Sequence, residues 1–293
     1  MLKEIIRKIT PQAIQVIHGK YEQYQLKNKI VKYLKNASEF EELEKQKIIK
    51  YLTDNPLAVF PYDFTKKYNV DNIKVYTDDD CEMKYVLHEN KRLYFKKNWE
   101  EKKIQNSYIF LLLEQDIDSP HRYETADFCV THGDIVVDAG VAEGNFALSI
   151  VEKVEKLYLF EADEEWIEAL EMTFAPWKEK VEITCKYISD NDGENCITLD
   201  RFLGKRKINF IKADIEGEEM AFLKGSQHIL SNTDKLKIVM CTYHNQDDAK
   251  DINQLLTNYN FTTEFSKGYM FFLYDDDPLI PPYLRKGVIR AKK

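Results

Sequence analysis

The sequence predicts an α/β fold in which a mainly parallel β-sheet follows a smaller region of helices and a β-hairpin. Three observations predict it. From about residue 128, short apolar segments alternate with helical segments. The last two apolar segments lie too close together for a helix between them, and the first 118 residues have a different pattern. Strands that alternate with helices are typical of right-handed βαβ units, which build a parallel sheet.

The N-terminal region, residues 1–118, is predicted to form a small α+β cap. Its second helix should begin near Ser38 and Glu41, which have the spacing of a capping box. Pro120 forbids continuation of the last helix. In order, the helical pair spans residues 12–55, the hairpin around HENK spans 73–99, and the last helix spans 99–114.

Residues 119–293 are predicted to form the sheet domain. The predicted strands are DIVVDAG (134–140), KLYLFEAD (156–163), EITCKYIS (182–189), NFIKADI (209–215) and KIVMCTY (237–243). The first two helices between them are NFALSIVEKV (145–154) and EWIEALEMTFAPW (165–177). The stretch FTTEFSKGYMFFLYD (261–275) predicts two strands joined at Ser266 to Gly268. They should pair antiparallel, because parallel neighbours need a crossover of a dozen or more residues.

Composition and charge exclude some functions. The longest apolar run has six residues, whereas a membrane span needs about 18. The N-terminus lacks the apolar stretch of a signal peptide, so we expect a cytoplasmic protein. The net charge is −8, although residues 1–50 carry 11 Lys and Arg against 6 Glu, and RKGVIRAKK ends the chain. These basic ends could face an anionic partner, but we favour a solvated helix face and a frayed tail. An acidic body argues against nucleic-acid binding.

The loop in DIVVDAGVAEGNFALSI is the strongest functional signal. Ligands of open α/β sheets bind at the carboxyl ends of the strands, where Asp138, Gly140 and Gly144 are expected to lie. A dinucleotide loop places glycines on a pyrophosphate, but here Asp138 precedes the first glycine and Glu143 lies inside the loop. Two carboxylates would repel a pyrophosphate. They favour a ligand with an amino group and a sulfonium, such as S-adenosylmethionine.

Glu161, in LFEAD, ends the second strand of the predicted sheet, 23 residues after Asp138. An acid at this place accepts hydrogen bonds from ribose hydroxyls in nucleotide-binding sheets. Taken alone, Glu161 is equally well an ordinary acid at a strand end. Its position relative to the Asp138 loop favours the ribose role.

Four motifs carry a family resemblance. VVDAGVAEGNFAL, LFEAD, ITLDRF and NFIKADIEGEEMAFLKGSQHIL together resemble the FkbM-type methyltransferases, over about residues 134–229. The resemblance implies a class I methyltransferase fold, Rossmann-like, with seven strands and an antiparallel terminal hairpin. The loop departs from the family, which usually has Ala and Asn where this chain has Val141 and Ala142. Glu143 and Asn145 are the candidates to replace that contact with the methionine end of the cofactor.

The resemblance also assigns the rest of the site. Ser189 and Asp190 would face the adenine, although Ser-Asp before a glycine is also an ordinary turn. Asp214 ends the fourth strand, where methyl donor and acceptor must meet. The expected cofactor-binding residues are Asp138, Gly140, Ala142, Glu143, Gly144, Asn145, Glu161, Ala162, Ser189, Asp190 and Asp214.

Methyl transfer to oxygen needs an oriented nucleophile and usually one base. The candidates are His244 in CTYHNQD, Asp214, and His121 in SPHRY. His244 is best placed, just past a strand end, and its side chain titrates near neutral pH. His121 begins the run HRY, which we weigh as a substrate or cofactor contact against a plain linker. Glu216 and Glu219 are expected near a helix start, Glu219 as a cap.

A divalent metal held by Asp214, Glu216 and His244 is an alternative that the spacing does not support strongly. The sequence thus predicts an S-adenosylmethionine-dependent O-methyltransferase. The resemblance implies a sugar hydroxyl as acceptor, in a surface-polysaccharide or related glycan precursor. Two alternatives stay open at this point: a nicotinamide-dependent oxidoreductase on a Rossmann fold, and a binding module without catalysis. The oligomeric state is not predicted.

Overall fold

The computed structural model describes residues 12–273 and 279–293 of the chain. By its contacts the chain divides into two compact units. One contains the described residues up to 65 together with those from 269 to 284, and the other contains residues 66–268 and 285–293. The boundary at residue 118, which we placed where the sequence pattern changes, stays a prediction. By compactness, residues 66–118 belong with the large sheet.

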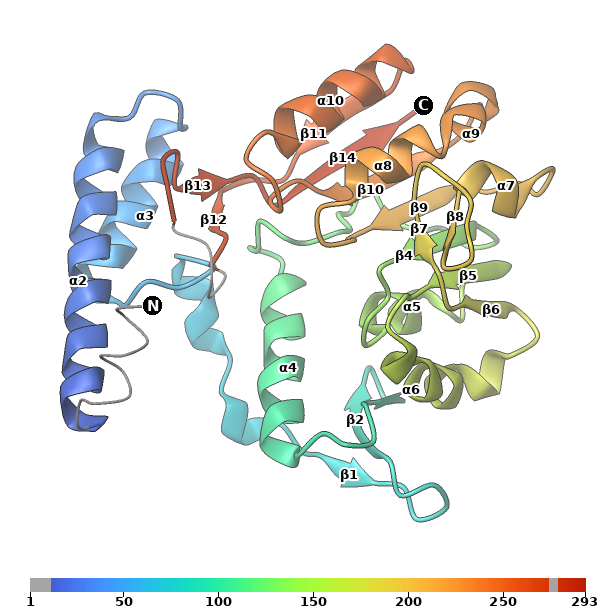
Figure 1. The fold of residues 1–293 in the computed structure, drawn as a ribbon, viewed down its shortest axis with the longest axis horizontal. Helices are drawn as coiled ribbons and strands as arrows, with labels where there is room; N and C mark the ends of the chain where they lie inside the picture. Colours follow the sequence, from blue (N-terminus) through green and yellow to red (C-terminus); the bar gives the residue numbers. More distant parts are fainter. Residues whose placement is uncertain (1–11, 274–278) are drawn as a thin grey trace. The chain divides into compact units, whose positions relative to one another are not determined.

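The second unit is built on a seven-stranded sheet (Figure 1). Its spatial order is β11, β14, β10, β9, β4, β5, β6, and the last five of these strands run parallel. β14 lies antiparallel between β10 and β11, so the predicted mixed sheet is confirmed. The strands span Ile135–Ala139 (β4), Lys156–Phe160 (β5), Val181–Thr184 (β6), Phe210–Ala213 (β9), Lys237–Cys241 (β10), Thr262–Phe265 (β11) and Val288–Lys292 (β14).

The partner of β11 differs from the prediction. We expected β11 to pair with the stretch after Gly268, but its partner is β14, from the C-terminal segment that we took for a frayed tail. The stretch after Gly268 instead forms β12 (Met270–Phe271), which pairs with β13 (Leu284–Arg285). The strand was missed because VIRAK (Val288–Lys292) contains two basic residues, which are typical of an exposed tail. Its Arg290 is 8% exposed and donates to the backbone oxygens of Arg122 and Tyr123, so the charge is accommodated inside the fold.

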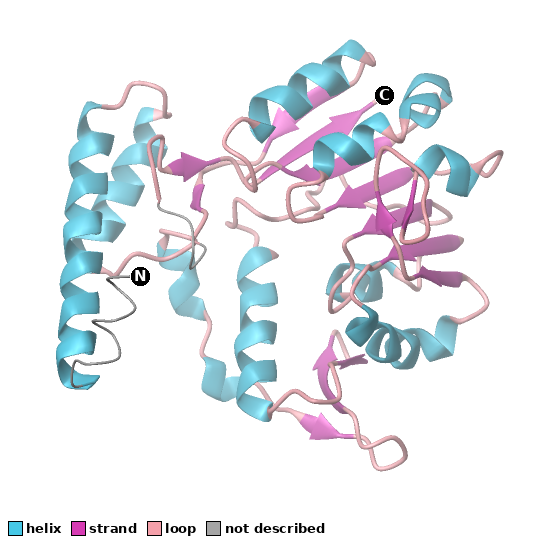
Figure 2. Cartoon of the chain, viewed as in Figure 1, coloured by secondary structure: helices cyan, strands magenta, loops and turns pink. Residues whose placement is uncertain are grey.

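Alternation along the strands divides the sheet into two faces. Alternate residues of the central strands, such as Val137, Ile211 and Met240, pack in one apolar cluster with side chains from α7, α8, α9 and α10. The intervening residues, including Asp138 and Lys212, point to the opposite face. Figure 2 shows the helices packed along the strands. The helices are α5 (Asn145–Ile150), α6 (Glu164–Phe174), α7 (Leu199–Leu203), α8 (Glu219–Lys224), α9 (Gln227–Asn232) and α10 (Asp248–Asn258).

The predicted hairpin and the helix after it are confirmed. β2 (Lys84–His88) pairs antiparallel with β3 (Lys91–Tyr94), and β1 (Tyr76–Thr77) extends the sheet. The turn residues Glu89 and Asn90 both have positive φ, at 50° and 65°, which is the backbone of a type I′ hairpin turn. Helix α4 covers Glu101–Glu114.

The first unit packs α2 (Gln12–Asn36) against α3 (Glu42–Asp54) around an apolar core that includes Ile30, Leu34 and Leu52. The predicted capping box is wrong. Helix α3 begins after Glu41, which makes no side-chain cap. The Glu41 N–H, which a capping box would direct to the Ser38 hydroxyl, donates to Tyr269 Oη at 3.3 Å, and Phe40 packs on the same ring. Within the described residues, the helices are too short or too polar to span a bilayer.

Candidate active site

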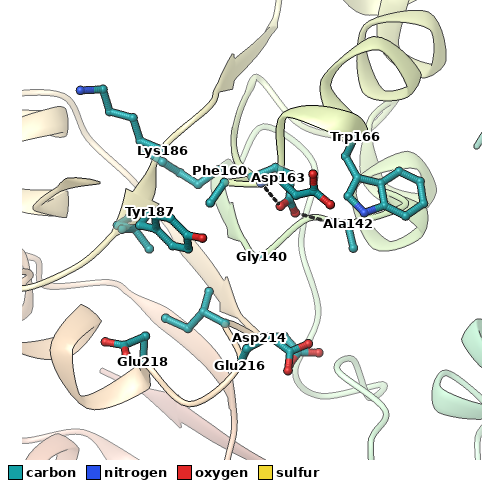
Figure 3. Close-up of a pocket in the computed structure, with 14 residues that line it drawn as sticks. Gly140, Ala142, Phe160, Asp163, Trp166, Lys186, Tyr187, Asp214, Glu216 and Glu218 are labelled. Atoms are coloured by element: carbon teal, nitrogen blue, oxygen red, sulfur yellow. Dashed lines mark hydrogen bonds between the residues drawn. The ribbon is translucent and has the colours of Figure 1, made fainter. Parts of the chain in front are cut away.

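A cavity of about 470 Å³ opens at the carboxyl ends of β4, β5 and β9 (Figure 3). This is the edge of the sheet where the sequence predicted the ligand, and the volume is within the usual range for a site that binds a small molecule. The cavity is lined by Gly140, Ala142, Phe160, Glu161, Ala162, Asp163, Trp166, Lys186, Tyr187, Ile188, Asp214, Ile215, Glu216 and Glu218.

Gly140 follows the last residue of β4 and lies against the backbone of Asp214, which follows β9. Its φ is +71°, and a Cβ at this position would lie 1.7 Å from the backbone oxygen of Asp214. Its N–H donates to the backbone oxygen of Phe160 at 3.0 Å, and the Asp214 N–H donates to Ala139 at 3.1 Å. A side chain cannot fit at this position, so only glycine allows the two strand ends to form the floor of the cavity.

Glu161 holds the loop that follows β4. Its Oε2 accepts from the Ala142 N–H at 2.7 Å and its Oε1 from the Asp163 N–H at 2.8 Å, drawn as dashed lines in Figure 3. Ala142 has φ +47°, a left-handed conformation that Gly and Asn adopt more easily. The position where the family usually has Asn is therefore one at which Asn has a conformational advantage.

Part of the cavity lining is aromatic and apolar. Phe160, Ile188 and Trp166 are buried, whereas Tyr187 is 62% exposed at the rim. Figure 3 shows Tyr187 and Trp166 on opposite sides of the cavity. A flat heterocycle can stack in such a setting.

The lining is strongly acidic. Five carboxylates contribute to it, from Glu161, Asp163, Asp214, Glu216 and Glu218, against a single lysine in the lining; Asp163 is paired with Lys96 from outside it, which leaves an excess of negative charge. That lysine, Lys186, turns its ammonium to the loop carbonyls of Glu194 at 2.8 Å and Gly193 at 3.4 Å. The cavity therefore attracts a cation and repels a phosphate.

Asp138 lies beneath the loop and is not part of the cavity lining. It is 1% exposed, and it stands directly opposite Lys212 across the β4–β9 pair. Lys212 Nζ lies 3.0 Å from Asp138 Oδ1 and donates to the backbone oxygen of Gly140 at 2.6 Å. Burial alone would lower the pKa of Lys212, but Asp138 and Asp214 raise it, so the amine stays charged. Asp138 therefore acts on the loop through Lys212, and a direct contact with a cofactor stays a prediction.

Asp214 lies between two histidines. His121 Nε2 is 3.5 Å from Oδ2 and His244 Nε2 is 3.5 Å from Oδ1. Tyr123 donates to Oδ2 at 2.7 Å and Tyr243 to Oδ1 at 3.3 Å. Asp214 is the member of this cluster that also lines the cavity.

The charges of this cluster shift its proton equilibria. Burial alone would raise the pKa of Asp214, but His121, Lys212 and His244 outweigh it and hold that pKa well below its usual range. Burial also favours neutral imidazoles, yet neighbouring carboxylates raise the pKa of both histidines. Burial raises the pKa of Glu114, whose Oε1 is 4.0 Å from His121 Nε2, to about 7. Asp214 is thus a fixed anion, Glu114 can exchange a proton near neutral pH, and the two histidines hold their protons more tightly than a free imidazole.

Glu219 orients His244. Its carboxylate is fully buried, and Oε1 lies 2.9 Å from His244 Nδ1. Glu219 lies at the helix start that the sequence predicted, as the first residue of α8, and its carboxylate accepts from the Ile215 N–H at 3.2 Å while the side chain is fully buried. Nε2 of His244 is left facing Asp214 and, at 4.0 Å, Glu216.

The predicted site residues fall into two groups. The cavity lining contains Gly140, Ala142, Glu161, Ala162 and Asp214. The others lie outside the lining: Asp138, Glu143, Gly144, Asn145, Ser189, Asp190, His121 and His244. Burial raises the pKa of Glu143, which accepts a hydrogen bond from Ser107 of α4, and a Cβ on Gly144 would meet Leu170 and Phe174. Both hold the loop in place, and their direct contact with a cofactor stays a prediction.

Several residues of the site were not predicted. Lys212 carried a signal, because a lysine between Ile211 and Ala213 in a buried strand needs a charged partner. Tyr187 and Trp166 carried none, since aromatic residues are more often core. Glu114 lies only seven residues before His121, but a glutamate at the end of a helix carried no signal of a buried group that keeps its proton.

The strand order and the glycine turn define the class. A sheet in the order found here, with one antiparallel strand inserted near its end and an acid after the second strand, is the class I methyltransferase fold. Residues 144–263 match the family model described as the methyltransferase FkbM domain. The resemblance predicted from the sequence is thus confirmed over this part of the chain.

Solved structures resemble the chain only distantly. The methyltransferase FkbM from Methylobacillus flagellatus KT is 16% identical with a TM-score of 0.46, over 66% of this chain and 53% of that one. The chain thus spans about half the length of that protein. A magnesium protoporphyrin IX methyltransferase from Synechocystis PCC 6803, solved with bound SAM, is 15% identical with a TM-score of 0.41, over 67% and 84% of the two chains. An rRNA methylase from Streptococcus thermophilus is 15% identical with a TM-score of 0.40, over 56% and 89%. No curated protein sequence matches the chain.

Proposed function

We propose that this protein is an S-adenosylmethionine-dependent methyltransferase that methylates a hydroxyl oxygen. The observation that carries the proposal is the charge of the cavity. Five carboxylates line it, and its single lysine is engaged by loop carbonyls. A cofactor with an amino group and a sulfonium gains from this charge, because opposite charges attract strongly in a site of low dielectric. When bound, this cofactor supplies an electrophilic methyl group.

The cavity residues suit the three parts of that cofactor. Glu161 keeps lone pairs for ribose hydroxyls, since each of its oxygens accepts one backbone hydrogen bond. Tyr187 and Ile188 offer an apolar surface to adenine. Asp214 and Glu216 supply negative charge at the other end of the cavity, where the methyl group would be presented.

The histidines next to Asp214 are suited to take the proton of the acceptor hydroxyl. His244 and His121 are each 3.5 Å from Asp214, whose own low pKa makes it a poor base. Asp214 instead stabilises the imidazolium that forms. A general base must be neutral to accept a proton, and the pKa of both histidines is raised. The rate should therefore keep rising with pH above the range in which an ordinary histidine loses its proton.

The acceptor is a finer proposal. The family resemblance favours a sugar hydroxyl in a surface-polysaccharide or related glycan precursor, modified in the cytoplasm. The basic N-terminal region would then bind a phosphate-bearing donor or lipid carrier. A nicotinamide-dependent oxidoreductase is disfavoured, because the acidic lining would repel a pyrophosphate.

The test is transfer of a radiolabelled methyl group to a panel of sugars, nucleotide sugars and oligosaccharides. We expect label in at least one hydroxyl acceptor with the wild type and none with Glu161→Ala. Tight cofactor binding without transfer to any acceptor would favour the non-catalytic binding module.

A further inference from the structure

Two carboxylates and one imidazole converge behind the cavity. Asp214 follows β9, Glu219 begins α8 and His244 follows β10. One oxygen of each carboxylate and one ring nitrogen of His244 all lie within 4.8 Å of one another. Donor atoms around one divalent cation lie about 3 to 4.4 Å apart, because each is about 2.0 to 2.2 Å from the ion. Small side-chain shifts therefore bring the three donors to bonding distance.

Glu219 gives the independent indication of a ligand. Its side chain is fully buried at 0% exposure. Oε1 lies against His244 Nδ1 at 2.9 Å and accepts from the Ile215 N–H at 3.2 Å. Oε2 is also buried, and within the described part of the chain it has no hydrogen-bond partner. A carboxylate oxygen is costly to bury without a donor or a cation, so the ion pair with His244 satisfies only half of this group.

We propose that Asp214, Glu219 and His244 bind a divalent cation that reaches the acceptor oxygen. The inference rests on the proposed function for the role of the ion, but binding itself does not depend on it. Two carboxylate oxygens and one imidazole nitrogen suit Mn²⁺ and similar ions of intermediate hardness. Asp214 belongs to the cavity lining and its side chain is 19% exposed, so an ion held by it would border the cavity.

A bound ion would give the two histidines different roles. With His244 as a ligand, His121 becomes the base. A hydroxyl oxygen on the cation loses its proton to His121, because a divalent cation lowers the pKa of a bound hydroxyl. The oxygen then forms the bond to the methyl carbon as the carbon–sulfur bond breaks, and the electron pair of that bond stays on sulfur. The product is a neutral thioether, so positive charge leaves the donor.

The ligand set differs from the one that the sequence suggested. Glu216 was the second carboxylate there, but its side chain is 75% exposed and its Oε2 is 4.0 Å from His244 Nε2. Glu219 takes its place. Glu216 lies in the turn before α8, three residues before Glu219, so Glu216→Gln is a nearby control for Glu219→Gln.

The experiment titrates the purified full chain with Mn²⁺ by calorimetry and by electron paramagnetic resonance, without cofactor. We expect one ion per chain, with affinity reduced at least about tenfold in Glu219→Gln and reduced much less in Glu216→Gln, which removes a nearby charge but no ligand. Electron spin-echo modulation from a coordinated ¹⁴N should appear in the wild type and vanish in His244→Ala. The wild-type ¹⁴N signal tests the site even if Glu219→Gln fails to fold.

Absence of ¹⁴N coupling, or equal loss in the two glutamine variants, would overturn the inference and leave Oε2 of Glu219 to an ordered water. S-adenosylhomocysteine binding by the same preparation separates the two proposals. Cofactor binding without Mn²⁺ binding refutes the metal site alone. Mn²⁺ binding without cofactor binding refutes the proposed function alone.

Discussion

Replacing Gly140 with alanine should destabilise the protein by about 3 to 6 kcal/mol and abolish cofactor binding. The new Cβ would lie 1.7 Å from the Asp214 backbone oxygen, whereas such carbon–oxygen contacts are normally about 3.3 Å or more, so the ends of β4 and β9 must separate by about 1.6 Å. The left-handed φ of +71° adds about 1 to 2 kcal/mol for alanine. Overpacking costs about 1 to 3 kcal/mol, and loss of the Asp214 to Ala139 hydrogen bond about 1 kcal/mol.

Gly133→Ala is the matched control. Gly133 has φ +83°, and nothing lies within 4 Å of its added Cβ, so this variant bears the conformational cost alone, about 1 to 2 kcal/mol. Urea denaturation of both variants gives the free energy of unfolding, and titration with S-adenosylhomocysteine gives the affinity. If Gly140→Ala were as stable as Gly133→Ala and bound the ligand normally, the close approach of the two strand ends would not be what forms the floor of the cavity.

Four further predictions concern single side chains. Lys212→Met should lower the free energy of unfolding by about 3 to 5 kcal/mol in urea denaturation, because it leaves Asp138 as an unpaired buried charge, and adding Asp138→Asn should recover part of the loss. Between pH 4.5 and about 7 the folded state keeps a proton on Glu114 that the unfolded state has released. The free energy of unfolding should therefore fall as the pH rises through this range, by about 3 kcal/mol more in the wild type than in Glu114→Gln. Equal pH profiles would contradict the burial of this group. Glu161→Ala should weaken S-adenosylhomocysteine binding at least about tenfold in calorimetry, because the Ala142 N–H of the loop and the Asp163 N–H lose their acceptor and a ribose would lose it too; an unchanged affinity would remove Glu161 from the site. With an acceptor in hand, His244→Ala should cut turnover by about 100-fold at nearly unchanged cofactor affinity, and an unimpaired rate would exclude it both as base and as ligand.

Sequence patterns predicted the sheet and the loop because both depend on local features. β4 and β5 are continuous apolar segments, and the turn after β4 needs glycine at position 140, so type and spacing of residues were sufficient. Glu161 was predicted for the same reason, as an acid at a strand end. Each of these features lies within about 30 residues of the loop in the sequence.

Features that depend on distant pairing could not be predicted. β14 carries Arg290 and Lys292, and its strand character appears only because β10 and β11 flank it on both sides. The partners Asp138 and Lys212 lie on strands that are adjacent in the sheet but separated by 74 residues in the chain. Likewise, His121 and Asp214 meet although 93 residues separate them in the chain. Periodicity along the chain contains no information about such contacts.

The most direct test of the central claim is a calorimetric titration of the wild-type chain with S-adenosylhomocysteine, with NAD⁺ and NADH as controls. The acidic cavity predicts saturable binding of S-adenosylhomocysteine at one site and no binding of either nicotinamide nucleotide. Binding of a nicotinamide nucleotide in place of S-adenosylhomocysteine would contradict both the assignment of the loop after β4 and the proposed methyl transfer.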